Sequence, residues 1–88
     1  MQRKRKITPA SRFVVCIDNS GYEASLERRK IYPLLPDPDA AEDNDLRIID
    51  ESGEDYLYEA DRFVAIEVPT RLERVLLKEF SQAGLGMR

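Results

Sequence analysis

The 88-residue chain has no histidine, no tryptophan and a single cysteine, Cys16. The missing histidines exclude a Ser-His-Asp triad, a thiolate–imidazole pair and any zinc site with an imidazole ligand. One cysteine cannot form an intramolecular disulfide, which fits a reducing compartment. Cys16 lies in an apolar run with no base nearby in the sequence, so we expect it to fill the core.

An all-carboxylate magnesium or calcium site stays chemically open, but the acids around Ser52-Gly53 lack the alternating spacing of a calcium loop. We therefore expect no metal, no cofactor and no enzymatic activity.

The chain also lacks a long apolar run, since none approaches the roughly 18 residues that a membrane-spanning helix needs. The segment Met1–Lys6 has the charge of a signal-peptide start, but no apolar segment follows it. At 42% hydrophobic and 35% charged residues, the composition is that of a soluble globular protein. A chain of this length forms one domain with a modest core. The sequence therefore predicts a single small cytoplasmic domain that does not contact membranes.

Short apolar runs separated by turn residues predict five strands. The first two runs are Phe13–Ile17 and Lys30–Leu35. Pro33 cannot donate a hydrogen bond to a strand ladder, so we expect it at an edge, at a bulge or at the strand end. In the midsection, two runs rich in β-branched and aromatic residues flank a polar turn, and a third follows after a short spacer. This pattern predicts a three-stranded antiparallel meander with strands at about residues 46–50, 55–59 and 63–68.

The segments around these strands differ in charge and periodicity. Residues 1–11 read as a flexible basic tail, and Tyr22–Arg29 as a long ordered loop pinned by its first residue and by Leu26. Pro36–Asp45 has five acids and two prolines, which predicts a solvated loop. The domain is expected to span residues 12–69.

The last part of the chain has helical periodicity. Its apolar residues recur at steps of three and four, which predicts a helix over about 70–83 with one apolar face. Thr70 and Glu73 have the spacing of a capping box, and Gly84 can end the helix, leaving residues 84–88 as a tail. The apolar residues of this face are Leu72, Val75, Leu76, Phe80 and Ala83.

The order of these segments resembles a known fold. Five short strands, a long loop after the first and the spacer Ala60-Asp61-Arg62 before the last are similar to a small Src-homology-3-like barrel, which has a 3₁₀ turn at that spacer. The stretches 19–27, 30–32 and 49–58 also resemble a family of small uncharacterised bacterial proteins. The likeness covers about residues 12–68. It implies a mainly β fold, a small five-stranded antiparallel barrel with a C-terminal α-helix, and it implies no activity. Polyproline recognition is disfavoured, because the chain has no tryptophan and has Glu59-Ala60 where such domains often place a proline.

Tyrosines are the main candidates for contacts with a partner. Tyr56 and Tyr58 share one face of the strand at 55–59, and Leu57 points to the other face. If Leu57 is in the core, both tyrosines point outward and form a patch that Asn19 and Tyr22 border. The alternative is that the tyrosines only pack against the barrel rim. We predict a non-enzymatic protein–protein interaction module that binds its partner through Asn19, Tyr22, Tyr56 and Tyr58.

Two further interpretations come from the ends of the chain. The cluster Arg3, Lys4, Arg5 and Lys6 can neutralise phosphates, so a nucleic-acid-associated accessory protein is the alternative function. Such a cluster also serves simply to keep a chain soluble. The apolar face of the helix at 70–83 either caps the barrel or supports self-association.

Overall fold

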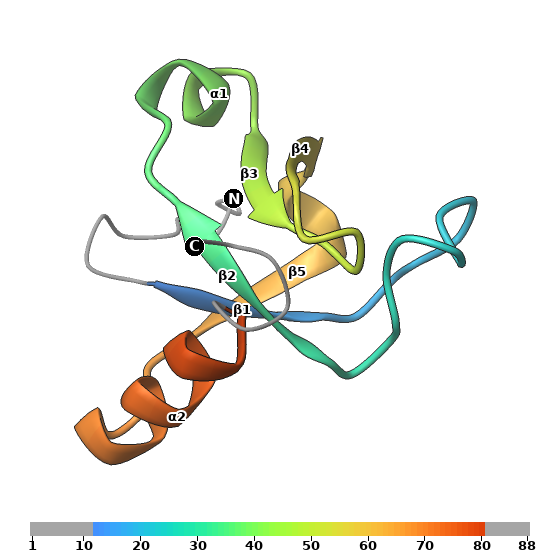
Figure 1. Ribbon diagram of the computed structural model, residues 1–88. Helices are drawn as coiled ribbons and strands as arrows, with labels where there is room; N and C mark the ends of the chain where they lie inside the picture. Colours follow the sequence, from blue (N-terminus) through green and yellow to red (C-terminus); the bar gives the residue numbers. More distant parts are fainter. Residues whose placement is uncertain (1–11, 81–88) are drawn as a thin grey trace.

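The computed structural model describes residues 12–80, which form five strands, two α-helices and one 3₁₀ turn (Figure 1). The fold is mainly β, as the sequence predicts, and an α-helix follows the last strand. In chain order the elements are β1 (Phe13–Cys16), β2 (Ile31–Leu35), α1 (Pro38–Glu42), β3 (Asp45–Ile49), β4 (Asp55–Glu59), η1 (Ala60–Arg62), β5 (Phe63–Ile66) and α2 (Thr70–Phe80).

All five strands belong to one antiparallel sheet with the order β4-β3-β2-β1-β5. The predicted meander is therefore wrong in its third strand. β3 and β4 form a hairpin, but β5 pairs with β1, with Phe13 opposite Ile66 and Cys16 opposite Phe63. The 3₁₀ turn η1 connects the edge strand β4 to the opposite edge strand, β5. It occupies the spacer at which the sequence predicts such a turn.

β2 joins the two halves of the sheet. Val14 lies opposite Tyr32 on the β1 side, whereas Leu34 lies opposite Ile48 on the β3 side. Pro33 stands where the partner changes, inside the central strand rather than at an edge or end. The Leu34 N–H donates to the Arg12 carbonyl, on the β1 side. Because neighbouring residues point their N–H groups in opposite directions, residue 33 would donate toward β3, where the ladder has not yet begun. The missing N–H of Pro33 is therefore tolerated.

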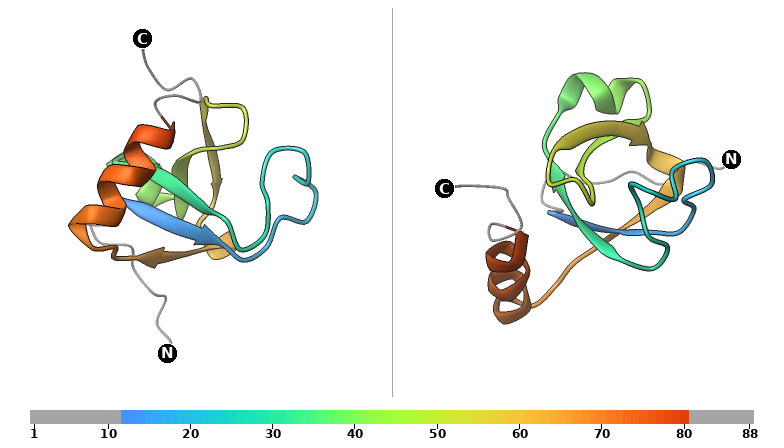
Figure 2. Two further views of the ribbon diagram at one scale, coloured as in Figure 1. Left: turned by 60° about the horizontal axis from the view of Figure 1, so that its bottom comes forward. Right: turned by 45° about the vertical axis from the view of Figure 1, so that its right-hand side comes forward.

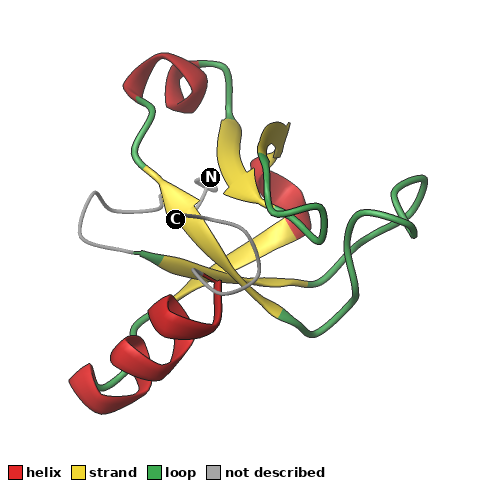
Figure 3. Cartoon of the chain, in the orientation of Figure 1, coloured by secondary structure: helices red, strands yellow, loops and turns green. Residues whose placement is uncertain are grey.

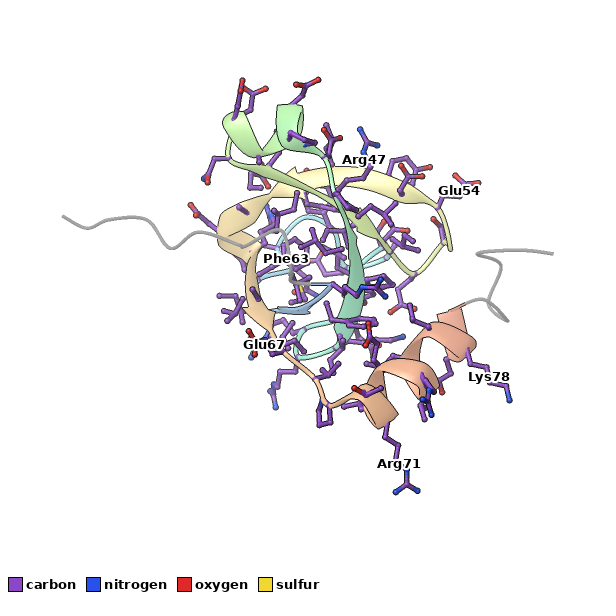
Figure 4. The ribbon with its side chains drawn as sticks, turned by 90° about the vertical axis from the view of Figure 1, so that its left-hand side faces the viewer. Arg47, Glu54, Phe63, Glu67, Arg71 and Lys78 are labelled. Carbon is purple, nitrogen blue, oxygen red and sulfur yellow. The ribbon has the colours of Figure 1, made fainter. Side chains whose placement is uncertain are left out.

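The sheet bends around a single core, to which all five strands contribute (Figure 2). The edges of the sheet are β4 and β5, and within residues 12–80 these two strands do not pair, so the predicted closed barrel is not confirmed. Figure 4 shows Phe63 in the interior between the strands. The core consists of Val14, Cys16, Leu26, Tyr32, Leu46, Ile48, Tyr58 and Phe63.

Cys16 is fully buried in this core, as predicted. Burial raises the pKa of its thiol, because the thiolate would lose its hydration. The thiol is therefore protonated at neutral pH and is a poor nucleophile.

The acidic segment before β3 contains a short helix, α1, that the sequence analysis missed (Figure 3). The Asp37 carboxylate caps it by accepting a hydrogen bond from the Ala40 N–H at 3.0 Å, and Pro38 stands in the first turn. Ala40 is buried, and the helix packs against β3. The signal was present in the sequence, because an aspartate followed by proline is typical of a helix start.

The predicted C-terminal helix is confirmed over Thr70–Phe80, and the rest of its predicted range lies outside the described residues. Thr70 is the first helical residue rather than the cap, and the Glu73 carboxylate accepts a hydrogen bond from Arg12 at 2.9 Å. α2 lies on the side of β1 and β2 that faces away from β4 (Figure 2). Within residues 12–80, neither helix has the length and apolar content needed to cross a bilayer.

Candidate protein-binding surface

The loop between β1 and β2 is long but held in place from within. Leu26 inserts into the core and is 1% exposed. The Asn19 side-chain amide donates to the Leu26 carbonyl at 2.9 Å, and the Leu26 N–H donates to the Tyr22 carbonyl at 2.8 Å. The predicted ordered loop with Leu26 as its anchor is therefore confirmed. Asn19, which the sequence analysis proposed as a contact residue, serves here to shape the loop.

Tyr22 leaves this loop and packs against β4. Its ring meets the Tyr58 ring edge-on, with 5.0 Å between the ring centroids and an interplanar angle of 85°. The Arg62 guanidinium lies over the Tyr22 ring, 4.7 Å from its centroid. Tyr22 is still 38% exposed. One part of the ring is thus fixed by protein contacts, and the remainder faces solvent.

Arg62 ties the loop to η1 and β5. Its Nη1 donates to the carbonyls of Asp18 and Ser20, at 3.2 and 2.9 Å, and its Nε donates to the Glu59 carboxylate at 2.7 Å. The Arg62 carbonyl in turn accepts a hydrogen bond from the Ile17 N–H at 2.8 Å. An arginine fork with several fixed acceptors holds its rotamer well. Arg62 therefore positions the segment that carries Tyr22.

Tyr58 is buried, contrary to the outward position that the sequence analysis allowed for it. It is 5% exposed, whereas Leu57 is 46% exposed. The premise that Leu57 belongs to the core is wrong, so the inner and outer faces of β4 are the reverse of those that the premise implies. Opposite Tyr58 in the hairpin lies the buried Leu46, which marks this face as the inner one.

The Tyr58 hydroxyl reaches a carboxylate that is also buried. It donates to Asp50 Oδ2 at 2.7 Å, while Asp50 Oδ1 accepts from the Ser52 hydroxyl and N–H at 2.6 and 2.9 Å. Burial, with help from the hydrogen bond to Asp50, raises the pKa of Tyr58 to about 12. The β3–β4 turn, predicted to be solvated, therefore has one inward-facing acid, Asp50, that is 4% exposed.

Tyr56 shares the inner face of β4 with Tyr58 but lies beyond the core. The residue is 49% exposed, and its hydroxyl donates to the Glu54 carboxylate at 3.0 Å. Glu54 sits in the β3–β4 connection (Figure 4). Side chains two residues apart on a strand face the same way at a spacing of roughly 7 Å. We call Tyr22, Tyr58 and Tyr56 the tyrosine row, in which the buried Tyr58 contacts the Tyr22 ring and shares a strand face with Tyr56.

The fourth tyrosine, Tyr32, belongs to a separate internal network that the sequence analysis did not anticipate. Its hydroxyl donates to Glu51 at 2.6 Å and accepts from the Glu27 N–H at 2.7 Å, and Lys30 Nζ lies 2.7 Å from Glu51. Burial is the main cause that raises the pKa of Tyr32, and the bond to Glu51 adds to it. Tyr32 and Glu51 are 19 positions apart, so no local pattern announces their contact.

Charge on the described part of the chain is strongly negative. Residues 12–80 contain nine Lys and Arg against 17 Asp and Glu, a net charge of −8, although the whole chain carries −3. The predicted nucleic-acid-binding residues Arg3, Lys4, Arg5 and Lys6 lie outside the described residues. Nowhere in the described part do three or more Cys, Asp and Glu side chains gather as a metal ion would require.

No protein-family model matches the chain, and neither a curated protein nor a solved structure resembles it at a significant level. The resemblance to a bacterial family stays a prediction.

Proposed function

We propose that the protein is a non-enzymatic protein–protein interaction module that binds its partner through the tyrosine row. This proposal rests on two exposed tyrosines next to the buried Tyr58: Tyr22, whose ring packs on it, and Tyr56, two positions away on the same face of β4. Tyrosine is enriched at interfaces because its ring supplies apolar area at little conformational cost while its hydroxyl bonds a partner. The rigid support of Tyr22 by Arg62 and Tyr58 lowers that cost further.

The structure of the sheet supports the finer fold assignment that the resemblance implies. We infer an Src-homology-3-like barrel, because η1 occupies the expected spacer and all five strands face one core. The bacterial origin and the cytoplasmic location that the sequence predicts remain part of this proposal.

Site-specific crosslinking in the native cell tests the protein-binding function. The photoreactive residue p-benzoylphenylalanine replaces Tyr22 or Tyr56 in separate variants, and Leu57, on the opposite face of β4, in a control. We expect one defined protein adduct from positions 22 and 56 and none from position 57. Equal labelling from all three positions, or no adduct from the tyrosine positions, would contradict the proposed function.

The alternative function, nucleic-acid association through Arg3, Lys4, Arg5 and Lys6, has less support. A domain with a net charge of −8 repels a phosphate backbone, so the attraction of four basic residues has to overcome the rest of the molecule. Fluorescence anisotropy with single-stranded and duplex oligonucleotides, at low and raised salt, separates the two functions. We expect no binding near physiological salt. Salt-sensitive binding that disappears when residues 2–6 are deleted would favour the alternative.

A further inference from the structure

We propose that the tyrosine row receives a lysine or arginine side chain of the partner. This inference rests on the proposed function and names the chemistry of the partner. It follows from the charges that surround the two exposed rings and from a contact that the protein already makes to one of them.

Acidic residues dominate the segments that form the row. Residues 17–23 and 54–62 contain one basic residue, Arg62. Its guanidinium is engaged by Glu59 at 2.7 Å and approaches Asp18 at 3.6 Å. The acids of these two segments are Asp18, Glu23, Glu54, Asp55, Glu59 and Asp61.

One of these carboxylates, that of Glu54, lies directly beside an exposed ring, and a second, that of Glu23, follows Tyr22 in the chain. Glu54 accepts the hydrogen bond of the Tyr56 hydroxyl, and the Glu23 side chain accepts from the Gly21 N–H, next to Tyr22. Within residues 12–80, no lysine or arginine lies within ion-pair distance of either carboxylate. The Tyr56 ring is therefore bordered by a negative charge that a partner's cation can neutralise.

The rings themselves suit a cation. The Arg62 guanidinium lies over the Tyr22 ring at 4.7 Å, which shows that a cation packs on an aromatic face of the row and that this position is filled from within the protein. Tyr56, which is more exposed than Tyr22, offers a second ring. A cation placed against Tyr56 would be near both aromatic carbon and the Glu54 carboxylate, which accepts from the Tyr56 hydroxyl, and this combination favours lysine and arginine over neutral side chains. An acidic segment would meet only like charges at the same place.

Three short peptides test this inference against the full-length protein. Each has one central residue flanked by valines in a glycine–serine background, and the central residue is lysine, glutamine or glutamate. Amide shifts in ¹H–¹⁵N spectra report where each peptide binds. We expect the lysine peptide to shift Tyr22 and Tyr56 and to bind on the order of tenfold more tightly than the glutamate peptide, with the difference shrinking at high salt.

Variants of the protein assign the effect to the row. Tyr56→Ala is expected to weaken binding of the lysine peptide about tenfold, as for a central interface aromatic. Glu54→Gln should weaken it less and should reduce its salt dependence. The matched control, Leu57→Ala, removes a comparably exposed side chain from the opposite face of β4 and should leave the affinity unchanged.

Three results would contradict the inference, each in a different way. Equal affinity for the lysine and glutamate peptides at the row would overturn the choice of a basic partner, and the crosslinking result would still stand. Absence of shifts at the row with all three peptides also overturns the inference. In a further variant Arg3, Lys4, Arg5 and Lys6 are all changed to glutamine. If that change alone moves the Tyr22 and Tyr56 signals, the chain's own basic segment is the occupant, and the inference of a separate partner is wrong.

Discussion

Tyr58 and Tyr56 differ in role although they are two positions apart on the same face of one strand. The Tyr58 hydroxyl is enclosed and has Asp50 as its partner, whereas the Tyr56 hydroxyl meets Glu54 at the surface. Burial therefore decides which of two chemically identical side chains stabilises the fold and which is free to contact a partner.

Removing the Tyr58 hydroxyl is predicted to destabilise the protein. Tyr58→Phe leaves Asp50 buried with one hydrogen bond fewer, so the free energy of unfolding should fall by about 1–2 kcal/mol. Urea unfolding followed by circular dichroism measures this change. Tyr56→Phe removes an exposed hydroxyl and is the control, with an unchanged urea midpoint. Equal midpoints for both variants would show that the Tyr58–Asp50 bond contributes nothing.

The ionisation of Glu51 should make the free energy of unfolding depend on pH. Burial alone would raise the pKa of this carboxyl, but hydrogen bonds from Lys30 and Tyr32 outweigh it and lower the pKa in the folded state. A carboxyl with a lowered folded pKa stabilises the fold above its unfolded value of about 4.3, and this contribution is lost as the pH falls through the folded pKa. Glu51→Gln should therefore make the unfolding free energy decline less steeply below about pH 5.

Urea titrations at a series of pH values measure this slope. Lys30→Gln removes the other half of the ion pair, whose Nζ lies 2.7 Å from Glu51, and should flatten the same part of the curve. The double variant should add little to either single change, because both remove one interaction. Full additivity of the two changes would contradict the coupling.

At the scale of elements, α1 depends on one residue for its start. Asp37 caps the helix and also accepts a hydrogen bond from Arg47 Nε at 2.7 Å. The Ala40 amide, followed by the Arg47 guanidinium, lowers the pKa of Asp37. Asp37→Ala should lower the urea midpoint, and Asp39→Ala, an exposed acid in the same helix, should not. Equal effects of the two variants would contradict the cap.

The face of α2 that the sequence analysis assigned to capping or self-association is only partly covered. Val75 is 52% exposed and Leu72 is 39% exposed, whereas Arg71 and Lys78 point away from the strands (Figure 4). Self-association through α2 stays a prediction. Sedimentation velocity over a range of concentrations tests it: Leu72→Ser/Val75→Ser should abolish any concentration-dependent association, and Arg71→Ser should not. A wild-type protein that remains monomeric throughout would contradict it.

Local sequence patterns predicted most of the helices and strands, but not which strands pair with each other. β-branched and aromatic runs identified all five strands, and the spacing after Pro69 identified α2. Pairing of β5 with β1 brings residues 13 and 66 together, and no spacing rule within a short window contains that contact. For a similar reason, the inner and outer faces of β4 were predicted the wrong way round. Alternation along a strand shows that Tyr58 and Leu57 point to opposite faces, but it does not show which of them faces the core.

At the scale of the whole molecule, the candidate surface is a product of this long-range pairing. η1 returns the chain to β1, and Arg62 at its end then reaches the loop that carries Tyr22. The sequence could suggest Tyr22 and Tyr56 as exposed aromatics. It could not suggest that Tyr58 joins them from the interior, or that Arg62 supports the loop from 42 residues away.

The charge of the protein is unevenly distributed along the chain. The described domain carries −8 and the remaining residues carry the compensating positive charge, so a near-neutral total conceals a strongly acidic body. This distribution favours basic over anionic partners and makes the association rate sensitive to ionic strength.

The candidate surface depends on the β1–β2 loop, which folds back so that Tyr22 packs on Tyr58. Nuclear Overhauser effects between the ring protons of these two tyrosines measure it most directly, because the ring centroids are 5.0 Å apart. We expect strong cross-peaks between the rings, and their weakening in Arg62→Lys, which cannot reproduce the guanidinium fork. Absence of these cross-peaks in a protein that retains the β3–β4 contacts would show that the tyrosine row does not form.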